Sequence, residues 1–354
     1  MPVHLYSFSF NPNPDWSAVL ADREEFLECE LFKFLCVSSS RASKKGPIDL
    51  EGTVDKFHLR QFFNFNAECI GAEWDGDHWN VHFRGTVDGK LYTKQCNILI
   101  SAVGGFGKLR EPNLPGLDRF KGRVFHTARW DHSFDIHDKR IAVIGNGCSA
   151  AQAIPNIVGD VKKITQYARS PQWYHSRPNS EFSSLQKFAF RYIPFWQRIH
   201  RMNIFFKTDH LASVYGPNEK QVRQRQALEE EARQYIYKEA PEKYHGFMVP
   251  DFPLGCKRRI YDPGYLASLH RDNIDLLPEG IKEVTETGII SDSGKEEDFD
   301  AIILATGFDV TSFLAPMNIA GKHGGSLHDQ WASHRGAQAY MGTFIHNFPN
   351  FATL

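Results

Sequence analysis

The chain has 354 residues, 42% of them hydrophobic, so it is long enough for two domains and can bury a sizeable core. Its net charge of −1 gives no electrostatic footprint for nucleic acid. The six cysteines form no C-x-x-C pair, which argues against a zinc or redox-disulfide motif and favours reduced thiols in a cytoplasmic protein.

Neither a signal peptide nor a membrane span is expected. The start of the chain has no basic segment followed by an apolar run. The longest uncharged stretch, Ile141–Gly159, contains a proline, two asparagines and a glutamine, which a membrane span disfavours.

Residues 29–53 differ in character from their surroundings. They include the polar and basic run Ser38–Pro47, which has no periodicity and predicts a loop or a disordered insert. A genuine surface loop and retained intron sequence are both open interpretations of this segment.

A β-rich region follows. Residues 79–83 alternate apolar and polar side chains, the period-two pattern of a half-buried strand, and residues 98–103 predict another strand. Pro112 and Pro115 then indicate a crossing between two domains.

A short apolar strand over 141–144 leads into a glycine-rich turn and a predicted helix over 148–157. The pattern G-x-G-x-x-A in this setting is typical of dinucleotide binding. The first glycine permits a tight turn, the second lets a pyrophosphate approach, and the alanine allows close helix packing. The candidate binding residues are Gly145, Asn146, Gly147, Cys148, Ser149 and Ala150.

The next predicted strand, 163–169, ends in Arg169 and Ser170, where an NAD site would place an acid for the ribose hydroxyls. A guanidinium suits the 2′-phosphate of NADPH instead. An incidental surface arginine beside a structural turn is the alternative.

Residues 183–245 predict helices, aromatic and basic at first and then strongly charged. Such a segment fits a helical subdomain beside a substrate pocket, or a helix on a membrane surface. Further on, Asp300–Ala305 predicts a buried strand that ends at Thr306-Gly307.

One motif points to a family. Phe120, Gly122, His126, Trp130 and Asp131 form F-x-G-x-x-x-H-x-x-x-W-D just before the glycine-rich turn. The motif resembles the fingerprint of Baeyer–Villiger monooxygenases, whose relatives that oxidise nitrogen or sulfur tend to carry Tyr or Phe at the tryptophan position.

Two further segments agree with this resemblance. Gly255-Cys256-Lys257-Arg258 is similar to the family's G-x-K-R, and Ala305-Thr306-Gly307-Phe308 is similar to its A-T-G-[FY] strand end.

The resemblance implies an enzyme that uses FAD, NADPH and O2 to convert a small-molecule ketone into an ester or lactone. Arg258 is then the candidate catalytic residue, because this chemistry needs a permanent cation beside an anionic oxygen species. Lys257 would hold the 2′-phosphate together with Arg169. His126 would couple NADPH docking to domain movement. Without the resemblance, residues 257–259 would read as a solvated basic turn.

The expected fold is α/β, with two dinucleotide-binding domains of which the FAD domain is incomplete. Residues 1–115 and 281–354 would form the FAD-binding part, and 116–280 the NADPH-binding domain with a helical insert at 183–245. The family's first G-x-G-x-x-G is absent before Gly145, and the chain stops just before the family's G-P-N segment. The resemblance therefore implies truncation at both ends and weak or no FAD binding.

Three alternative functions stay open at this point: an N- or S-oxygenating flavin monooxygenase, an NADPH-dependent disulfide reductase, and an inactive remnant that only binds NADPH. The tryptophan of the fingerprint disfavours the first, and the lack of C-x-x-C disfavours the second. The sequence indicates neither the particular ketone nor the oligomeric state.

Overall fold

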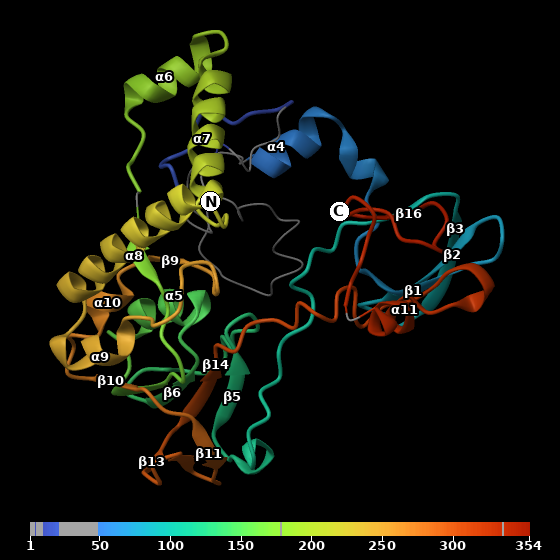
Figure 1. Ribbon diagram of the computed structural model, residues 1–354. Helices are drawn as coiled ribbons and strands as arrows, with labels where there is room; N and C mark the ends of the chain where they lie inside the picture. The colour runs from blue at the N-terminus through green and yellow to red at the C-terminus, as the bar shows by residue number, and fades with distance from the viewer. Residues whose placement is uncertain (1–3, 5–9, 21–48, 178, 335) are drawn as a thin grey trace. The chain divides into compact units, whose positions relative to one another are not determined.

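The computed structural model describes residues 4, 10–20, 49–177, 179–334 and 336–354 (Figure 1). The chain is a mixed α/β protein that divides into two compact units. Unit 1 comprises Met1–Arg60 and Asn113–Ala305, and unit 2 comprises Gln61–Pro112 and Thr306–Leu354. The chain therefore passes from one unit to the other near residues 60, 112 and 305.

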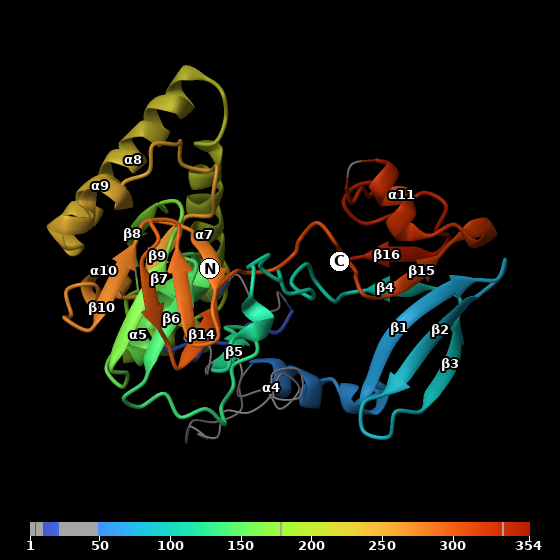
Figure 2. The ribbon, with the colours of Figure 1, turned by 90° about the horizontal axis from the view of Figure 1, so that it is seen from below.

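Unit 1 is built on a parallel sheet of five strands (Figure 2). Apolar residues run almost without interruption along its central strands, as expected where both faces of a parallel sheet are buried. Ile141, Ile164 and Ile303 are fully buried. In sheet order the strands are β10 (Ile274–Leu277), β7 (Lys163–Tyr167), β6 (Arg140–Ile144), β14 (Ala301–Leu304) and β5 (Arg123–His126).

The strand order locates the ligand end of this sheet. The chain builds outward from β6 to β7 and β10, and then returns to the other side of β6 with β14. The order therefore reverses between β6 and β14. In open α/β sheets, ligands bind at such a reversal, beyond the carboxyl ends of the strands. The turn after β6 lies at this point.

Two small sheets complete unit 1. Strands β11 (Ile281–Val284), β12 (Gly288–Ser291) and β13 (Glu296–Asp298) form an antiparallel meander between β10 and β14. Strands β8 (Tyr174–Ser176) and β9 (Ile260–Asp262) pair in parallel. This second pairing brings the residues before Ile260 back beside the residues that follow β7.

Local sequence signals explain where two helices of unit 1 begin. Ser183 and Asn218 each cap a helix through a reciprocal capping box with the glutamine three residues later. The helices are α4 (Asp49–Lys56), α5 (Cys148–Ile157), α6 (Ser184–Tyr192), α7 (Trp196–Ser213), α8 (Glu219–Glu239), α9 (His245–Met248) and α10 (Tyr265–Ser268), with short 3-10 turns at Leu117–Arg119 and Glu242–Tyr244.

Unit 2 has its own core around Trp79, whose side chain is fully buried and whose ring centroid lies 5.6 Å from that of Phe351. The indole N–H of Trp79 donates to the carbonyl of Pro349 at 2.7 Å. One sheet contains β15 (Asn318–Ala320), β1 (Ala67–Trp74), β2 (Trp79–Gly85) and β3 (Leu91–Cys96), and a second pairs β16 (Phe351–Thr353) with β4 (Leu99–Ser101). Helix α11 spans Leu327–Ser333, and a 3-10 turn lies at Lys322–Gly324. The 3-10 turn Leu59–Phe62 spans the boundary between the two units.

The strands predicted over 79–83, 98–103 and 300–305 are confirmed as β2, β4 and β14. The region 183–245 contains α6, α7, α8 and the start of α9. Of the expected insert at 29–53, residues 29–48 lie outside the described residues, and residues 49–53 belong to helix α4. None of the helices in the described ranges is both long and apolar enough to cross a bilayer.

The unit boundaries differ from the expected domain limits. We expected residues 281–305 to lie with the returning FAD-binding segment, but β14 pairs with both β6 and β5 inside the sheet of unit 1. The apolar run of β14 fills the position between those two strands. The chain therefore leaves unit 1 only after this strand. The assignment of the two units to FAD and NADPH stays a prediction.

Candidate nucleotide site

The two glycines after β6 have different physical roles. Gly145 adopts a positive φ of 110°, and a Cβ there would lie 2.7 Å from the carbonyl oxygen of Ala305 on the neighbouring strand end. Gly147 has an ordinary φ of −74°, and a Cβ there would meet nothing within 4 Å. Gly145 is therefore needed by the backbone, whereas Gly147 leaves open space at the start of α5.

Helix α5 presents its amino end to this space. Gly147 is the N-cap residue and offers no side chain to the free N–H groups of the first turn, which contains Cys148 and Ser149. Ala150 is fully buried in the main core of unit 1, so the helix can lie close to the sheet. Free N–H groups and the positive end of the helix dipole together suit a phosphate.

A buried network fixes the shape of the turn. Gln166 donates to the carbonyl of Gly145 at 2.9 Å and accepts from the Tyr265 hydroxyl at 2.6 Å. The Tyr174 hydroxyl donates to the carbonyl of Asn146 at 3.1 Å, and its ring stacks on that of Tyr265. Burial raises the pKa of both phenols, so they stay protonated and act as donors. No pattern in the sequence indicates Gln166, Tyr174 or Tyr265 as part of the site.

A second group of polar side chains lies beyond β7. Lys257 donates from Nζ to Oγ of Ser170 at 2.5 Å and to the carbonyl of Pro171 at 3.3 Å. The amide of Asn146 donates to the carbonyl of Ser170 at 2.8 Å. These contacts join the glycine-rich turn, the end of β7 and the loop before β9, so three predicted site residues come together.

The pairing of β8 with β9 explains this assembly. The backbone N–H of Ile260 donates to the carbonyl of Trp173 at 2.9 Å, which holds the basic loop beside Ser170. The ammonium of Lys257 also lies 4.8 Å from the ring centre of Phe252, so the face of the ring attracts its positive charge.

Arg169 and Arg258 are both exposed. Arg169 follows β7 directly, and its Cδ would lie 3.5 Å from a Cβ added at Gly280. Arg258 stands next to Lys257 in the chain, and the structure gives it no hydrogen bond or ion pair with any described residue. The guanidinium of Arg259, by contrast, lies 5.1 Å from the ring centre of Tyr261.

The fingerprint residues lie on β5 and its flanks, within unit 1. Phe120 is buried, and a Cβ on Gly122 would stand 2.5 Å from its ring and 2.6 Å from the carbonyl oxygen of Asp300. Buried His126 ends β5 and is in register with Leu304, two residues before the chain passes into unit 2. Its Nδ1 accepts the N–H of Ala128 at 3.0 Å.

The end of the fingerprint is a packed turn. The ring of Trp130 meets that of Phe125 edge-on at 5.1 Å and packs against the main core. Asp131 accepts from the side chain of Ser133 at 2.5 Å and from its N–H at 3.0 Å. These hydrogen bonds from Ser133, with a smaller contribution from Arg123, lower the pKa of Asp131. The motif thus stabilises one edge of the sheet next to a chain crossing.

The two segments of unit 2 that continue from the crossings are hydrogen-bonded to each other. The N–H of Arg110 donates to the carbonyl of Gly307 at 3.0 Å, and the hydroxyl of Thr306 donates to the carbonyl of Arg110 at 2.8 Å. The N–H of Asp309 donates to the carbonyl of Lys108 at 2.9 Å. The predicted crossing after Pro112 is therefore one strand of a paired connection.

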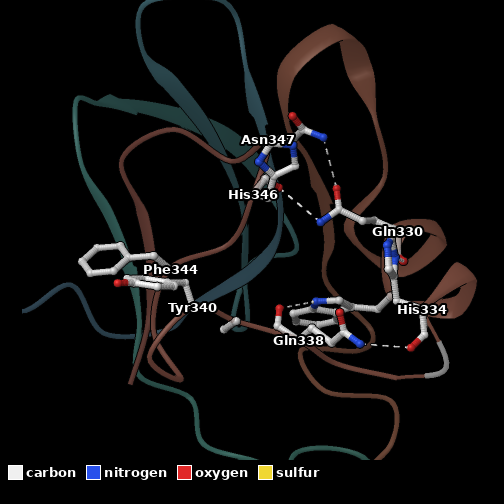
Figure 3. A pocket seen from close by; sticks show the side chains of 9 residues that line it. Gln330, His334, Gln338, Tyr340, Phe344, His346 and Asn347 are labelled. Carbon is white, nitrogen blue, oxygen red and sulfur yellow. Dashed lines mark hydrogen bonds between the residues drawn. The ribbon is translucent and has the colours of Figure 1, made fainter.

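Unit 2 contains a separate cavity of about 410 Å³ (Figure 3). Its amides already bond within the wall: Gln330 donates to the carbonyl of His346 at 3.2 Å, and Gln338 donates to that of His334 at 3.2 Å. Among the described residues, no Asp, Glu, Lys or Arg lines it. Because these two amides bond within the wall, we assign no ligand to this cavity.

Comparisons with known proteins show which class of fold the chain has. The model of the flavin-binding monooxygenase-like family matches residues 86–199. The FAD-binding monooxygenase ktnD of Aspergillus niger is 32% identical over 99% of this chain and 55% of its own length. A Baeyer–Villiger monooxygenase of Pseudomonas aeruginosa is 32% identical over 98% of this chain and 61% of its own length.

The structural comparison agrees. An oxidised steroid monooxygenase bound to NADP superimposes with a TM-score of 0.75 at 26% identity, over 100% of this chain and 70% of that one. These proteins make the chain similar to the Baeyer–Villiger type of the flavin-binding monooxygenases. It spans between 55% and 61% of the length of the two curated relatives described above.

Proposed function

We propose that this chain acts as an FAD- and NADPH-dependent Baeyer–Villiger monooxygenase, which inserts one atom of O2 into a ketone to give an ester or lactone. The observation that carries the proposal is the hydrogen bond of Lys257 to Ser170 beside the turn Gly145–Ala150. It places a cation next to a helix amino end, as a phosphorylated dinucleotide requires.

The residues present fit NADPH. The open space at Gly147 admits a pyrophosphate, and the first turn of α5 offers it N–H donors. Lys257 and Arg169 are assigned to the 2′-phosphate, with Ser170 orienting the ammonium of Lys257. Asn146 stabilises the whole arrangement, because it links the turn to the end of β7. NADPH supplies the electrons of the reaction and FAD the oxygen chemistry.

For FAD, no second G-x-G-x-x-G turn occurs in this sequence. We therefore assign no FAD contact to particular residues of this chain.

The free thiols of Cys69, Cys96, Cys148 and Cys256 fit a reducing compartment such as the cytoplasm.

Arg258 is proposed as the catalytic cation. Its exposure, and its position directly after the residue assigned to the 2′-phosphate, leave the guanidinium able to turn toward a reacting group. A guanidinium keeps its charge at every working pH, so it can stabilise negative charge on oxygen throughout the reaction. His126 is proposed as a positioning residue, because it ends β5 beside the strand that leads into unit 2.

The test measures incorporation of 18O2 into the product, with FAD, NADPH and a panel of cyclic and linear ketones. The proposal expects one 18O atom per ester or lactone. It expects Arg258→Ala to lose ester formation while NADPH oxidation continues. Arg271→Ala, which changes an exposed arginine on another loop, is the matched control. Undiminished ester formation by Arg258→Ala would refute the role of Arg258.

A second candidate function is a nucleotide-binding protein without oxygenase activity, favoured by the lack of a second glycine-rich turn. The colour of the purified protein separates the two. Flavin absorbance together with 18O-labelled ester supports the enzyme, whereas a colourless protein that still binds NADPH supports the second candidate.

A further inference from the structure

The basic loop, residues 252–259, contains Lys257, which is assigned to the 2′-phosphate. The contacts that hold this loop therefore also position the ammonium of Lys257. Gly255 has a positive φ of 108°, and a Cβ there would lie 2.7 Å from Cδ1 of Tyr215, which follows helix α7. The middle of the loop thus turns tightly against a side chain from outside the loop.

The first residues of the loop are anchored in a small core cluster. Leu254 is 2% exposed and packs in this cluster with Trp173 and with Ala232 of helix α8. The indole N–H of Trp173 donates to the carbonyl of Phe252 at 3.0 Å. The ring centre of Phe252 in turn lies 4.8 Å from the ammonium of Lys257. The chain is therefore fixed in the core shortly before it reaches Lys257.

A carboxylate on α8 completes this anchor. The backbone N–H of Leu254 donates to Oε1 of Glu229 at 2.8 Å. Nε of Arg225, one turn earlier on α8, lies 3.9 Å from the same oxygen, and the side chains of Arg225 and Glu229 are 21% and 17% exposed. A buried N–H needs a partner inside the protein, and a charged acceptor makes the stronger hydrogen bond. Glu229 therefore ties the backbone of the loop to α8.

The charge of Glu229 alone would have the opposite effect on a phosphate. A carboxylate repels an anion, so removing this charge should strengthen the binding of a 2′-phosphate if position played no part. Holding the loop acts in the other direction, because the hydrogen bond of Lys257 to Ser170 depends on where the loop lies. The sign of the change in affinity on substitution of Glu229 therefore separates the two roles.

We propose that Glu229 is a positioning residue for the choice of NADPH over NADH. Its carboxylate holds the N–H of Leu254, and through the loop it keeps the ammonium of Lys257 at Ser170, where the 2′-phosphate is assigned. Because NADH lacks this phosphate, its affinity does not depend on Glu229. The inference rests on the proposed function and extends the residues that determine NADPH selectivity to helix α8.

The test is fluorescence titration of the full chain with NADPH and with NADH under identical salt. Glu229→Ala should raise the Kd for NADPH by about fivefold and change the Kd for NADH by less than about twofold. Alanine favours the helix, so α8 should persist, and a thermal melt checks this. Glu229→Gln keeps an oxygen acceptor for the N–H of Leu254, so its Kd for NADPH should lie within about twofold of that of the unsubstituted protein.

Glu230→Ala is the matched control, because it removes the neighbouring acid of α8, whose partners Arg233 and Gln234 lie on the same helix. It should leave both dissociation constants unchanged. Unaltered or tighter binding of NADPH by Glu229→Ala would overturn the inference. An equal loss of affinity for both nucleotides, or a failure of Glu229→Gln to retain the affinity for NADPH, would overturn it as well.

Lys257→Gln, measured in parallel, distinguishes a failure of this inference from a failure of the proposed NADPH site. If Lys257→Gln lowers the preference for NADPH and Glu229→Ala does not, Glu229 has no positioning role while the proposed NADPH site stands. If the unsubstituted protein shows no preference for NADPH over NADH, the proposed site and the inference fail together.

Discussion

Replacing Lys257 by glutamine should change the choice between NADPH and NADH. Lys257 Nζ is held by Ser170 at 2.5 Å and by the carbonyl of Pro171 at 3.3 Å, so the ammonium already points to the end of β7. Glutamine keeps a polar group of similar length and removes only the charge. The adenine ribose of NADH carries a hydroxyl where NADPH carries a phosphate, so only the affinity for NADPH should fall.

The size of the effect follows from the contact. A hydrogen bond to a charged group contributes about 1.5–3 kcal/mol. Because Lys257 is only half-buried, the lower end applies, and about 1.4 kcal/mol corresponds to a tenfold change in affinity. We therefore expect the Kd for NADPH to rise by about tenfold and the Kd for NADH to change by less than about twofold.

Fluorescence titration of the chain with each nucleotide measures both constants under identical salt. Arg169→Gln should act in the same direction, since Arg169 is assigned to the same phosphate. Lys243→Gln, which removes a lysine in the 3-10 turn Glu242–Tyr244 of unit 1, serves as the control. If Lys257→Gln weakened the binding of NADPH and of NADH by the same factor, the assignment of Lys257 to the 2′-phosphate would be wrong.

Other substitutions separate structural from binding roles. Gly145→Ala should lower the free energy of unfolding by about 1–3 kcal/mol, because it forces a side chain into a positive φ, and a thermal melt measures this. Gly147→Ala should leave the melting temperature nearly unchanged yet abolish measurable NADPH binding in the same titration, because its Cβ enters the open space at α5. Gly122→Ala should destabilise the protein by about 1–3 kcal/mol through crowding, and a near-normal urea midpoint would contradict this. Burial and Arg259 lower the pKa of His175 to about 4, so protons favour the unfolded chain and stability should fall as the pH drops from about 6.5 to about 4. In His175→Phe, melts across this pH window should show a weaker dependence.

The local parts of the site could be predicted from the sequence. The turn Gly145–Ala150 follows from an apolar strand, two glycines and a small residue, all within one short segment, and Arg169 follows from counting to the next strand. The dihedral angle of Gly145 and the open space at Gly147 agree with the roles expected for the two glycines.

The long-range parts could not be derived in the same way. Lys257 and Ser170 are 87 residues apart, and their contact depends on the pairing of β8 with β9, two three-residue strands without a strong pattern. The family motif G-x-K-R suggested the lysine, but nothing suggested Gln166 as the side chain that holds the turn. Buried polar networks of this kind depend on tertiary packing.

The limits of unit 1 differ from the expected domain limits for a related reason. The apolar pattern of residues 300–305 predicted a buried strand without indicating which sheet it would join. Register with both β6 and β5 places it in unit 1, where its end at Ala305 stands over Gly145. Strand β14 lies inside the five-stranded sheet and also carries the chain into unit 2, and short sequence patterns do not encode both roles.

A crystal structure of the protein grown with NADP+ tests the central claim most directly. The account predicts a pyrophosphate against the first turn of α5 at Gly147, and a 2′-phosphate in contact with both Lys257 and Arg169. Crystals whose dinucleotide lies elsewhere, or whose turn at 145–150 stays empty at saturating NADP+, would contradict it.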